Sequence, residues 1–337
     1  MNRVAWRLLS VVSAAGALFL GGSWLASRRL AHRLLSATGL GETPDTGPEL
    51  SAALAAVAPI VEEFRHPGSA LDPVELAATF ASPGEPAARP TLLFLHGKGG
   101  RASEWLPDAA RALALGYNVL LPDLRGHGAS AGRYMTFGLL EKGDLARTLE
   151  AVRDRWGADP ANVGLHSCSA GSAVALELAR DRPDIRAIWL ESPFAEPRQM
   201  ARHYLSAATG IPAPVLTLAT RWAVSANVAR VRRDLGLDPS AGGLEKADPL
   251  TAIASVRCPV ALVYGGADRL IPPRFVERLI EALPPGSEVF RAEGAGHCHH
   301  PDEAAQVARV EYERRWRSFF ARHLPVSPLS PLGRGSG

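Results

Sequence analysis

Short apolar runs recur along the chain from about residue 60, and they alternate with longer stretches in which apolar positions follow a helical spacing. Short apolar runs bounded by turn residues are typical of buried strands, and the longer stretches are typical of amphipathic helices. The pattern predicts strands over residues 61–65, 75–81, 91–96, 118–123, 162–167, 185–191, 259–264 and 287–292, and helices over residues 103–115, 139–156, 170–181, 273–283 and 302–322. Strands that alternate with helices predict an α/β fold with a mostly parallel sheet and helices on both of its faces.

The N-terminal segment has a different pattern. Residues 8–27 carry no charged side chain, and about 20 apolar residues are enough to cross a bilayer as a helix. We therefore expect residues 1–38 to be a single-pass membrane anchor. Arginines flank the apolar run on both sides, so they leave its orientation open. A cleaved signal sequence, and hence secretion, is the alternative, and the absence of a polar face disfavours a helix packed on the domain.

The composition of residues 39–337 predicts three further segments. Residues 39–59 comprise a segment rich in glycine and proline and a short predicted helix around residues 49–58. Residues 60–324 are expected to form one domain, since 337 residues with 47% hydrophobic content can build one sizeable core. The tail over residues 325–337 is rich in proline, serine and glycine and is expected to be disordered.

The charge balance argues against a nucleic-acid partner. The chain has 37 basic and 34 acidic residues, which gives a net charge of +3. No long basic run with interleaved aromatic residues occurs in the sequence, and such runs are the usual mark of nucleic-acid binding. The basic residues are therefore interpreted as solvated surface.

A corner between a predicted strand and a predicted helix offers a candidate nucleophile. The small residues 167–171, Ser-Cys-Ser-Ala-Gly, separate the strand from the helix, and Ser169 holds the central position of a G-x-S-x-G motif. A serine in such a turn exposes its hydroxyl, and the next backbone N–H points toward a reacting carbonyl. Ser167 stands where the first glycine is usual, and its small size should preserve the turn. Taken alone, the stretch also fits a turn without chemistry.

Two more polar residues follow strands in the order that a catalytic triad requires. A serine hydroxyl needs a histidine to take its proton and an acid to orient that histidine. Asp268 follows the strand at 259–264 and a glycine turn, and His297 follows the strand at 287–292 and a glycine loop. Glu191, at the end of the sixth strand, is the second choice for the acid.

Two glycine-rich loops complete the set of motifs. Residues 91–100 read Thr-Leu-Leu-Phe-Leu-His-Gly-Lys-Gly-Gly, and residues 123–130 read Asp-Leu-Arg-Gly-His-Gly-Ala-Ser. With these motifs, the chain resembles the α/β-hydrolase superfamily over about residues 60–322. It looks most like the branch that contains serine aminopeptidase-like hydrolases, monoacylglycerol lipases and related esterases.

The resemblance implies both a fold and the roles of particular residues. The fold would be an α/β-hydrolase fold, with a mostly parallel eight-stranded sheet flanked by helices and a helical cap after the sixth strand, at about residues 195–255. Ser169 matches the nucleophile, Asp268 the acid and His297 the base. The oxyanion donors would be the backbone N–H groups of Ala170 and Lys98. Apolar cap residues are candidates to line an acyl pocket: Met200, Tyr204, Leu205, Val215, Leu216, Leu218, Trp222 and Val224.

These residues predict a serine hydrolase that cleaves carboxylic esters through an acyl-enzyme, without a cofactor. The substrate would be a small acyl ester or a lipid. Peptide or thioester cleavage on the same triad is the alternative, and halide-dependent peroxidation on that triad stays open because the fold does not fix the function. A non-catalytic binding protein is disfavoured, because serine, aspartate and histidine are all present.

The cysteines and the remaining histidines receive structural interpretations. Cys168, Cys258 and Cys298 give no disulfide framework. A bridge between Cys168 and Cys298, which flank the nucleophile and the base, is the less favoured alternative. The run at 297–300, His-Cys-His-His, invites a metal site, but adjacent residues cannot all converge on one ion, so no metal is expected. His96 and His127 are expected to order loops, and His166 to pack at a strand end.

Overall fold

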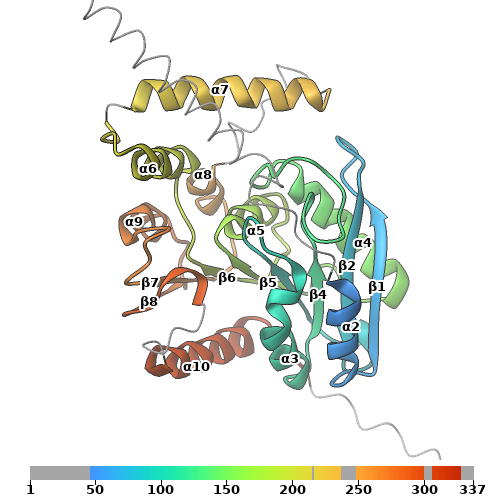
Figure 1. Cartoon of the computed structure of the whole chain (residues 1–337). Coiled ribbons are helices and arrows are strands. Elements are labelled where there is room, and N and C mark those ends of the chain that lie inside the picture. Colours follow the sequence, from blue (N-terminus) through green and yellow to red (C-terminus); the bar gives the residue numbers. More distant parts are fainter. Residues whose placement is uncertain (1–45, 215, 237–247, 300–305, 328–337) are drawn as a thin grey trace, which may run out of the picture.

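The computed structural model describes residues 46–214, 216–236, 248–299 and 306–327 (Figure 1). A single sheet forms the centre of this part of the chain. Its strands are β1 (Ile60–Pro67), β2 (Glu75–Ser82), β3 (Thr91–Leu95), β4 (Asn118–Pro122), β5 (Val163–Cys168), β6 (Ala187–Glu191), β7 (Val260–Gly265) and β8 (Glu288–Ala292). All of the strands predicted from the apolar runs are present, with bounds that differ by one or two residues.

The strands of the sheet follow the order β1-β2-β4-β3-β5-β6-β7-β8. β1 and β2 pair in antiparallel fashion, as do β2 and β4. The pairs from β4 through β3, β5, β6 and β7 to β8 are parallel. The carboxyl ends of these parallel strands therefore meet along one edge, which is where open α/β sheets form their sites. The predicted mostly parallel eight-stranded sheet is confirmed.

Helices cover both faces of the sheet (Figure 1). Their bounds are α2 (Gly47–Ala55), α3 (Leu106–Ala114), α4 (Glu141–Trp156), α5 (Ala170–Asp181), α6 (Pro197–Thr209), α7 (Thr217–Asp234), α8 (Pro249–Ile253), α9 (Glu277–Glu281) and α10 (Gln306–His323). One buried cluster joins α4, α5 and α8 to the sheet. The other joins α2, α3 and α10 to the opposite face. The central strands are buried on both faces, which explains why they read as continuous apolar runs rather than as alternating ones.

The predicted helical cap follows β6 as α6 and α7, which lie together at one end of the molecule (Figure 1). Two of the proposed pocket residues, Met200 and Leu216, are buried. Met200 belongs to the buried cluster that joins α4, α5 and α8 to the sheet, and Tyr204 packs against that cluster. Val215 lies outside the described residues, as do the side chains of Leu205, Leu218, Trp222 and Val224. α8, at the end of the predicted cap interval, packs against α5.

The predicted membrane anchor at residues 1–38 lies outside the described residues, as does most of the predicted tail. Within the part of the chain that the structure describes, no helix combines the length and the apolar character that a membrane span requires. The short helix expected at residues 49–58 is α2, which begins two residues earlier.

Candidate active site

Ser169 lies at the junction of β5 and α5, in a conformation that non-glycine residues rarely adopt. Its φ is 53° and its ψ is −119°, and α5 begins at the next residue, Ala170. Its backbone N–H donates to the Glu191 carbonyl oxygen at 2.8 Å, which anchors the turn to β6. Backbone strain of this kind persists only where the surroundings hold it, and it concentrates at functional positions. The turn therefore has the backbone of a nucleophile elbow.

The two small residues that flank the elbow show why its sequence reads Ser-x-Ser-x-Gly. A Cβ at Gly171 would lie 2.5 Å from the Leu95 carbonyl oxygen and 2.6 Å from that of His96, so only glycine fits. The other glycine position accepts a serine. The Ser167 side chain is buried, and its hydroxyl lies 3.3 Å from both the Ser172 hydroxyl and the Trp189 carbonyl oxygen. The buried Ser167 hydroxyl thus has hydrogen-bond partners, which explains how a serine fits at this position.

Asp268 and His297 are brought together by the loops after β7 and β8. His297 Nδ1 donates to Asp268 Oδ2 at 2.8 Å, and this fixes the tautomer in which Nε2 carries no proton. The other carboxylate oxygen of Asp268 accepts the backbone N–H groups of Leu270 and Ile271 at 2.9 and 2.8 Å. Asp268 is buried, whereas His297 is partly exposed. A buried, hydrogen-bonded carboxylate that orients a partly exposed imidazole is the arrangement that a general base needs.

Glu191, the second choice for the acid, lies against a different histidine. Trp316 Nε1 donates to His166 Nδ1 at 3.2 Å, so His166 Nε2 carries a proton and donates to Glu191 Oε1 at 2.7 Å. The Tyr312 hydroxyl donates to the same carboxylate oxygen. Burial, and then the charge of Glu191, raise the pKa of Tyr312 well above its usual range. These buried groups fasten α10 to β5 and β6. Sequence reasoning missed this network because its members come from three distant segments.

The turn after β3 approaches the elbow closely. A Cβ at Gly97 would lie 3.3 Å from the Ser169 Cβ, which places the backbone of this turn beside the nucleophile candidate. His96 holds the turn: its Nδ1 donates to the Gly97 carbonyl oxygen at 2.8 Å, and its Nε2 accepts the Leu124 N–H at 3.0 Å. Burial lowers the pKa of His96 to about 3, so the ring stays neutral and keeps both bonds at physiological pH.

Lys98, predicted to supply a backbone oxyanion donor, follows Gly97 in this turn, and burial lowers the pKa of its amine to about 8. Ala170, the other predicted donor, starts α5 directly after Ser169. The two predicted donor residues therefore belong to the two backbone segments that meet at the elbow.

The loop at residues 123–130 is ordered by its own polar side chains. The Asp123 carboxylate accepts the N–H groups of Ala102 and Ala129 at 2.8 and 2.9 Å. The buried Arg125 guanidinium binds the Asp144 carboxylate through two nitrogens, and it also binds Asp72. A second loop histidine, His127, is buried and lies 5.1 Å from His96, measured between ring centroids. These contacts support the expected structural role of both loop histidines.

Cys168 and Cys298 form a disulfide, with their Cα atoms 5.9 Å apart. The expectation that the cysteines are unpaired is therefore wrong. The cause is the course of the chain: the loop after β8, which carries the base candidate His297, brings Cys298 against Cys168 at the end of β5. Cys258 is the free, buried cysteine. Within the described residues, Cys168, His297 and Cys298 also form a cluster whose ligand-type atoms lie within 4.8 Å of one another. With its two sulfurs bonded to each other, this cluster offers no pair of thiolates to a metal.

Comparison with known proteins identifies the family. The sequence model of the alpha/beta hydrolase family matches residues 92–310, which include the elbow, the acid and the base candidates. This chain belongs to the alpha/beta hydrolase family. An uncharacterized protein of Mycobacterium tuberculosis is 31% identical to it over 209 residues, which are 62% of this chain and 63% of that relative. The chain thus spans less than two thirds of that relative's length.

Solved structures of related hydrolases support the same fold. An esterase from Pyrococcus furiosus matches with a TM-score of 0.59 and 21% identity, over 84% of this chain and 98% of that one. A puromycin-hydrolyzing peptidase from Mycobacterium tuberculosis matches with a TM-score of 0.58 and 20% identity, over 80% and 41% of the two chains. At these low identities, the comparison shows only that this chain shares its fold with the two enzymes.

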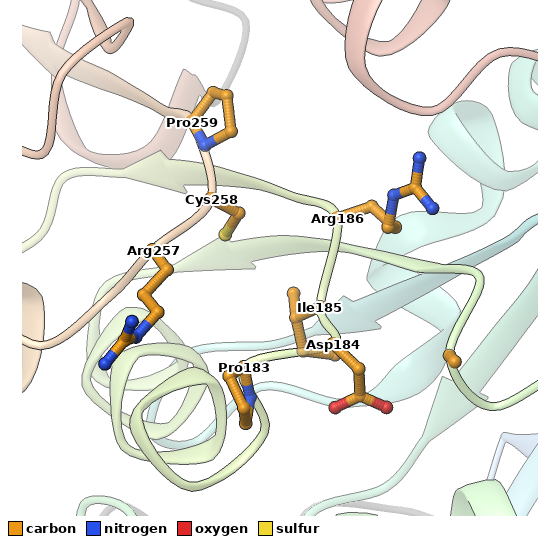
Figure 2. A pocket seen from close by; sticks show the side chains of 8 residues that line it. Pro183, Asp184, Ile185, Arg186, Arg257, Cys258 and Pro259 are labelled. Atoms are coloured by element: carbon orange, nitrogen blue, oxygen red, sulfur yellow. The ribbon is translucent and has the colours of Figure 1, made fainter.

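Two cavities lined by described residues lie away from the elbow. One, of about 400 Å³, is found at the amino ends of β5, β6 and β7, where Arg186, Arg257 and Cys258 line it (Figure 2). This is the edge of the sheet opposite to the triad candidates. The other, of about 470 Å³, lies between α6 and the turn at Pro273–Phe275. Ser169, Asp268 and His297 line neither cavity.

One residue of the predicted cap lies within electrostatic reach of the acid candidate. Burial, with a contribution from the negative charge of Asp268, raises the pKa of Tyr204 on α6 to about 12. Tyr204 also packs on the core cluster to which Met200 belongs. The first helix of the predicted cap is therefore packed on the core of the domain.

Proposed function

We propose that this protein is a serine hydrolase that cleaves carboxylic esters, with Ser169 as nucleophile, His297 as general base and Asp268 as the acid that orients the base. One observation supports the proposal above the others: an elbow serine with φ 53° lies next in sequence to a cysteine that is bonded to the residue after His297, and Asp268 holds that histidine. Sequence neighbours of the nucleophile and the base are thereby in covalent contact.

The reaction follows from these positions. His297 Nε2 takes the Ser169 proton while the serine oxygen attacks the ester carbonyl. The negative charge that develops on the carbonyl oxygen is stabilised by the backbone N–H groups of Ala170 and Lys98. The protonated imidazole then gives its proton to the departing alcohol and leaves an acyl-enzyme. Water, activated by the same base, releases the acid and restores the serine.

An acyl ester with an apolar acyl group is the substrate class that the surroundings favour. Tyr204 on α6 is within electrostatic reach of Asp268, and it packs on the apolar cluster to which Met200 belongs. The Pyrococcus furiosus neighbour is described as an esterase, which agrees with this chemistry. A peptide substrate is the second candidate, because another neighbour is described as a puromycin-hydrolyzing peptidase. A thioester substrate would use the same triad.

The test combines a covalent probe with a substrate panel. A fluorophosphonate should label the wild-type protein at Ser169, and Ser169→Ala should lose the labelling and reduce kcat by several orders of magnitude. Ser167→Ala and Ser172→Ala are matched controls from the same turn, and both should still be labelled. Labelling at residue 167 or 172, or an unlabelled wild type, would contradict the assignment. Faster turnover of aminoacyl p-nitroanilides than of p-nitrophenyl esters would favour the peptidase.

A further inference from the structure

The Cys168–Cys298 bridge lies directly beside the proposed nucleophile and the proposed base. It joins the residue before Ser169 to the residue after His297, across 130 positions of sequence. The two cysteines are thus the nearest chain neighbours of the proposed nucleophile and base. We propose that the bridge positions the base, so that the hydrolase turns over with the bridge closed and loses turnover when the bridge is reduced. This inference rests on the proposed function.

Within the described residues, the loop that carries His297 is held at its base and at its tip. The Ala295 carbonyl oxygen accepts the Ala267 N–H at 3.0 Å. The backbone of Ala295 and Gly296 also lies so close to Gly265 that a Cβ at residue 265 would clash with it. This contact holds the base of the loop. Past it, the tip is held by the His297 bond to Asp268, by the Cys298 N–H bond to the Ser192 hydroxyl at 3.1 Å, and by the bridge.

The other end of the bridge lies on the most firmly held part of the site. Cys168 is the last residue of β5 and pairs in register with Glu191 of β6. The next residue, Ser169, donates its N–H to the Glu191 carbonyl oxygen. The bridge thus ties a loop tip to the sheet edge that presents the nucleophile. Of the three attachments named for the tip, the bridge is the one that connects the loop of the proposed base directly to the elbow.

Opening the bridge is a two-electron step that a dithiol reductant balances. Two electrons and two protons pass to the sulfurs, the S–S bond breaks, two S–H groups form and the reductant closes to its own cyclic disulfide. The thiols then separate to van der Waals contact, and Cys298 carries His297 with it. A displacement of about 1 Å at a catalytic group can cost about 100-fold in rate. We therefore expect kcat to fall about 10- to 100-fold, with KM little changed.

The chain offers an internal control for any effect of reductant. Cys258 is unpaired and buried, it lies at the amino end of β7 away from the triad, and burial raises its pKa to about 12 (Figure 2). Cys258→Ala should therefore leave both the activity and the response to reduction unchanged.

The experiment uses the full-length protein. Wild type and Cys258→Ala are reduced with dithiothreitol, desalted under nitrogen with a chelator present, and assayed with p-nitrophenyl acetate for kcat, KM and the fluorophosphonate labelling rate. Thiol titration should rise by two per chain, while kcat and the labelling rate fall together. Oxidised glutathione should restore both. Cys168→Ala, Cys298→Ala and the double variant should show the low kcat with or without reductant, while circular dichroism stays native-like.

Several outcomes would overturn the inference. One is wild-type kcat in protein whose bridge is shown by titration to be open, and another is a response that disappears in Cys258→Ala. A loss that occurs only without the chelator would also overturn it, because Cys168, His297 and Cys298 would then be holding a metal ion such as Zn²⁺, for which thiolate and imidazole are the usual ligands. An oxidised wild type without activity or labelling would instead refute the proposed function, so the two failures are distinguishable.

Discussion

At the scale of single residues, the two buried carboxylates near the elbow have separate partners. Asp268 binds His297, which belongs to the loop after β8, and Glu191 binds His166, which lies inside β5. Both pairs have short contacts between a carboxylate and an imidazole. The difference lies in exposure, since His297 is partly exposed and His166 is fully buried. A proton acceptor for a substrate reaction has to be reachable, and the buried pair is not.

This difference gives a paired prediction. Asp268→Asn should lower kcat by about 10⁴-fold, because the amide favours the wrong imidazole tautomer. Glu191→Gln should keep kcat within a few-fold, but it should lower the free energy of unfolding by about 1–3 kcal/mol, since a buried charged acceptor is lost. Ester turnover and urea denaturation measure the two effects. The acid would have to be reassigned if Glu191→Gln lost turnover and Asp268→Asn kept it.

The residue types and their positions after predicted strands revealed the triad candidates, but not the contacts around them. Ser169, Asp268 and His297 each follow a strand and a small-residue turn, and these local signals are readable along the chain. The network around Glu191 is not, because Tyr312 reaches Glu191 and Trp316 reaches His166 only once α10 packs on the sheet. The bridge was considered, because Cys168 and Cys298 flank two residues that were expected to meet, but it was given too little weight.

At the scale of elements, the contact between α5 and the turn after β3 determines the geometry of the elbow. Gly171 lies in the first turn of α5 and is in close approach to the backbone at Leu95 and His96. The same approach places Ala170 and Lys98 on facing segments. A change that pushed the helix outward would therefore move one proposed oxyanion donor relative to the other.

Gly171→Ala makes that change with one methyl group. Its Cβ would lie within 2.6 Å of two carbonyl oxygens, so we expect a loss of about 1–3 kcal/mol of stability from overpacking and a fall in kcat of about 10- to 100-fold from misplacement. Ser172→Ala, one residue along, removes atoms instead of adding them and should keep kcat close to wild type. Thermal melts and ester assays on both variants provide the measurement. Equal activity of the two variants would mean that the helix tolerates the added carbon.

The elements themselves were largely predictable because their apolar patterns are strong. β3 and β4 are buried on both faces and read as unbroken apolar runs. α5 was predicted at the residues where it occurs, since the elbow marks its start. The alternation of strands and helices predicted a mostly parallel sheet, whereas the order of its strands was not predicted.

At the scale of the whole molecule, the described fold and the predicted anchor occupy separate parts of the chain. α2 begins at Gly47, and the sheet, the elbow and the loops of the triad candidates lie within the described residues after it. A protein shortened to begin at Thr46 should therefore keep kcat on a small soluble ester within about twofold, since the anchor's role would be membrane attachment through about 20 apolar residues. The full-length protein should sediment with membranes and resist extraction by alkaline carbonate.

Two results would contradict that division of roles. Loss of soluble-ester activity on shortening would make residues 1–45 part of the folded domain. A full-length protein that stays in the supernatant, or whose N-terminus is found cut within residues 8–27, would favour secretion over anchoring.

The Cys168–Cys298 bridge also bears on where in a cell this chemistry runs. Disulfides persist in oxidising compartments, whereas thiol reductants in the cytosol keep cysteines reduced. If activity depends on the closed bridge, newly made enzyme is idle in the cytosol and becomes competent only after its catalytic domain has been exported. The arginines beside residues 8–27 leave the membrane orientation open, and a requirement for the closed bridge would predict a domain that faces outward. Thiol alkylation of protein quenched in whole cells should then find one free cysteine per chain, and three would place the domain on the cytosolic side.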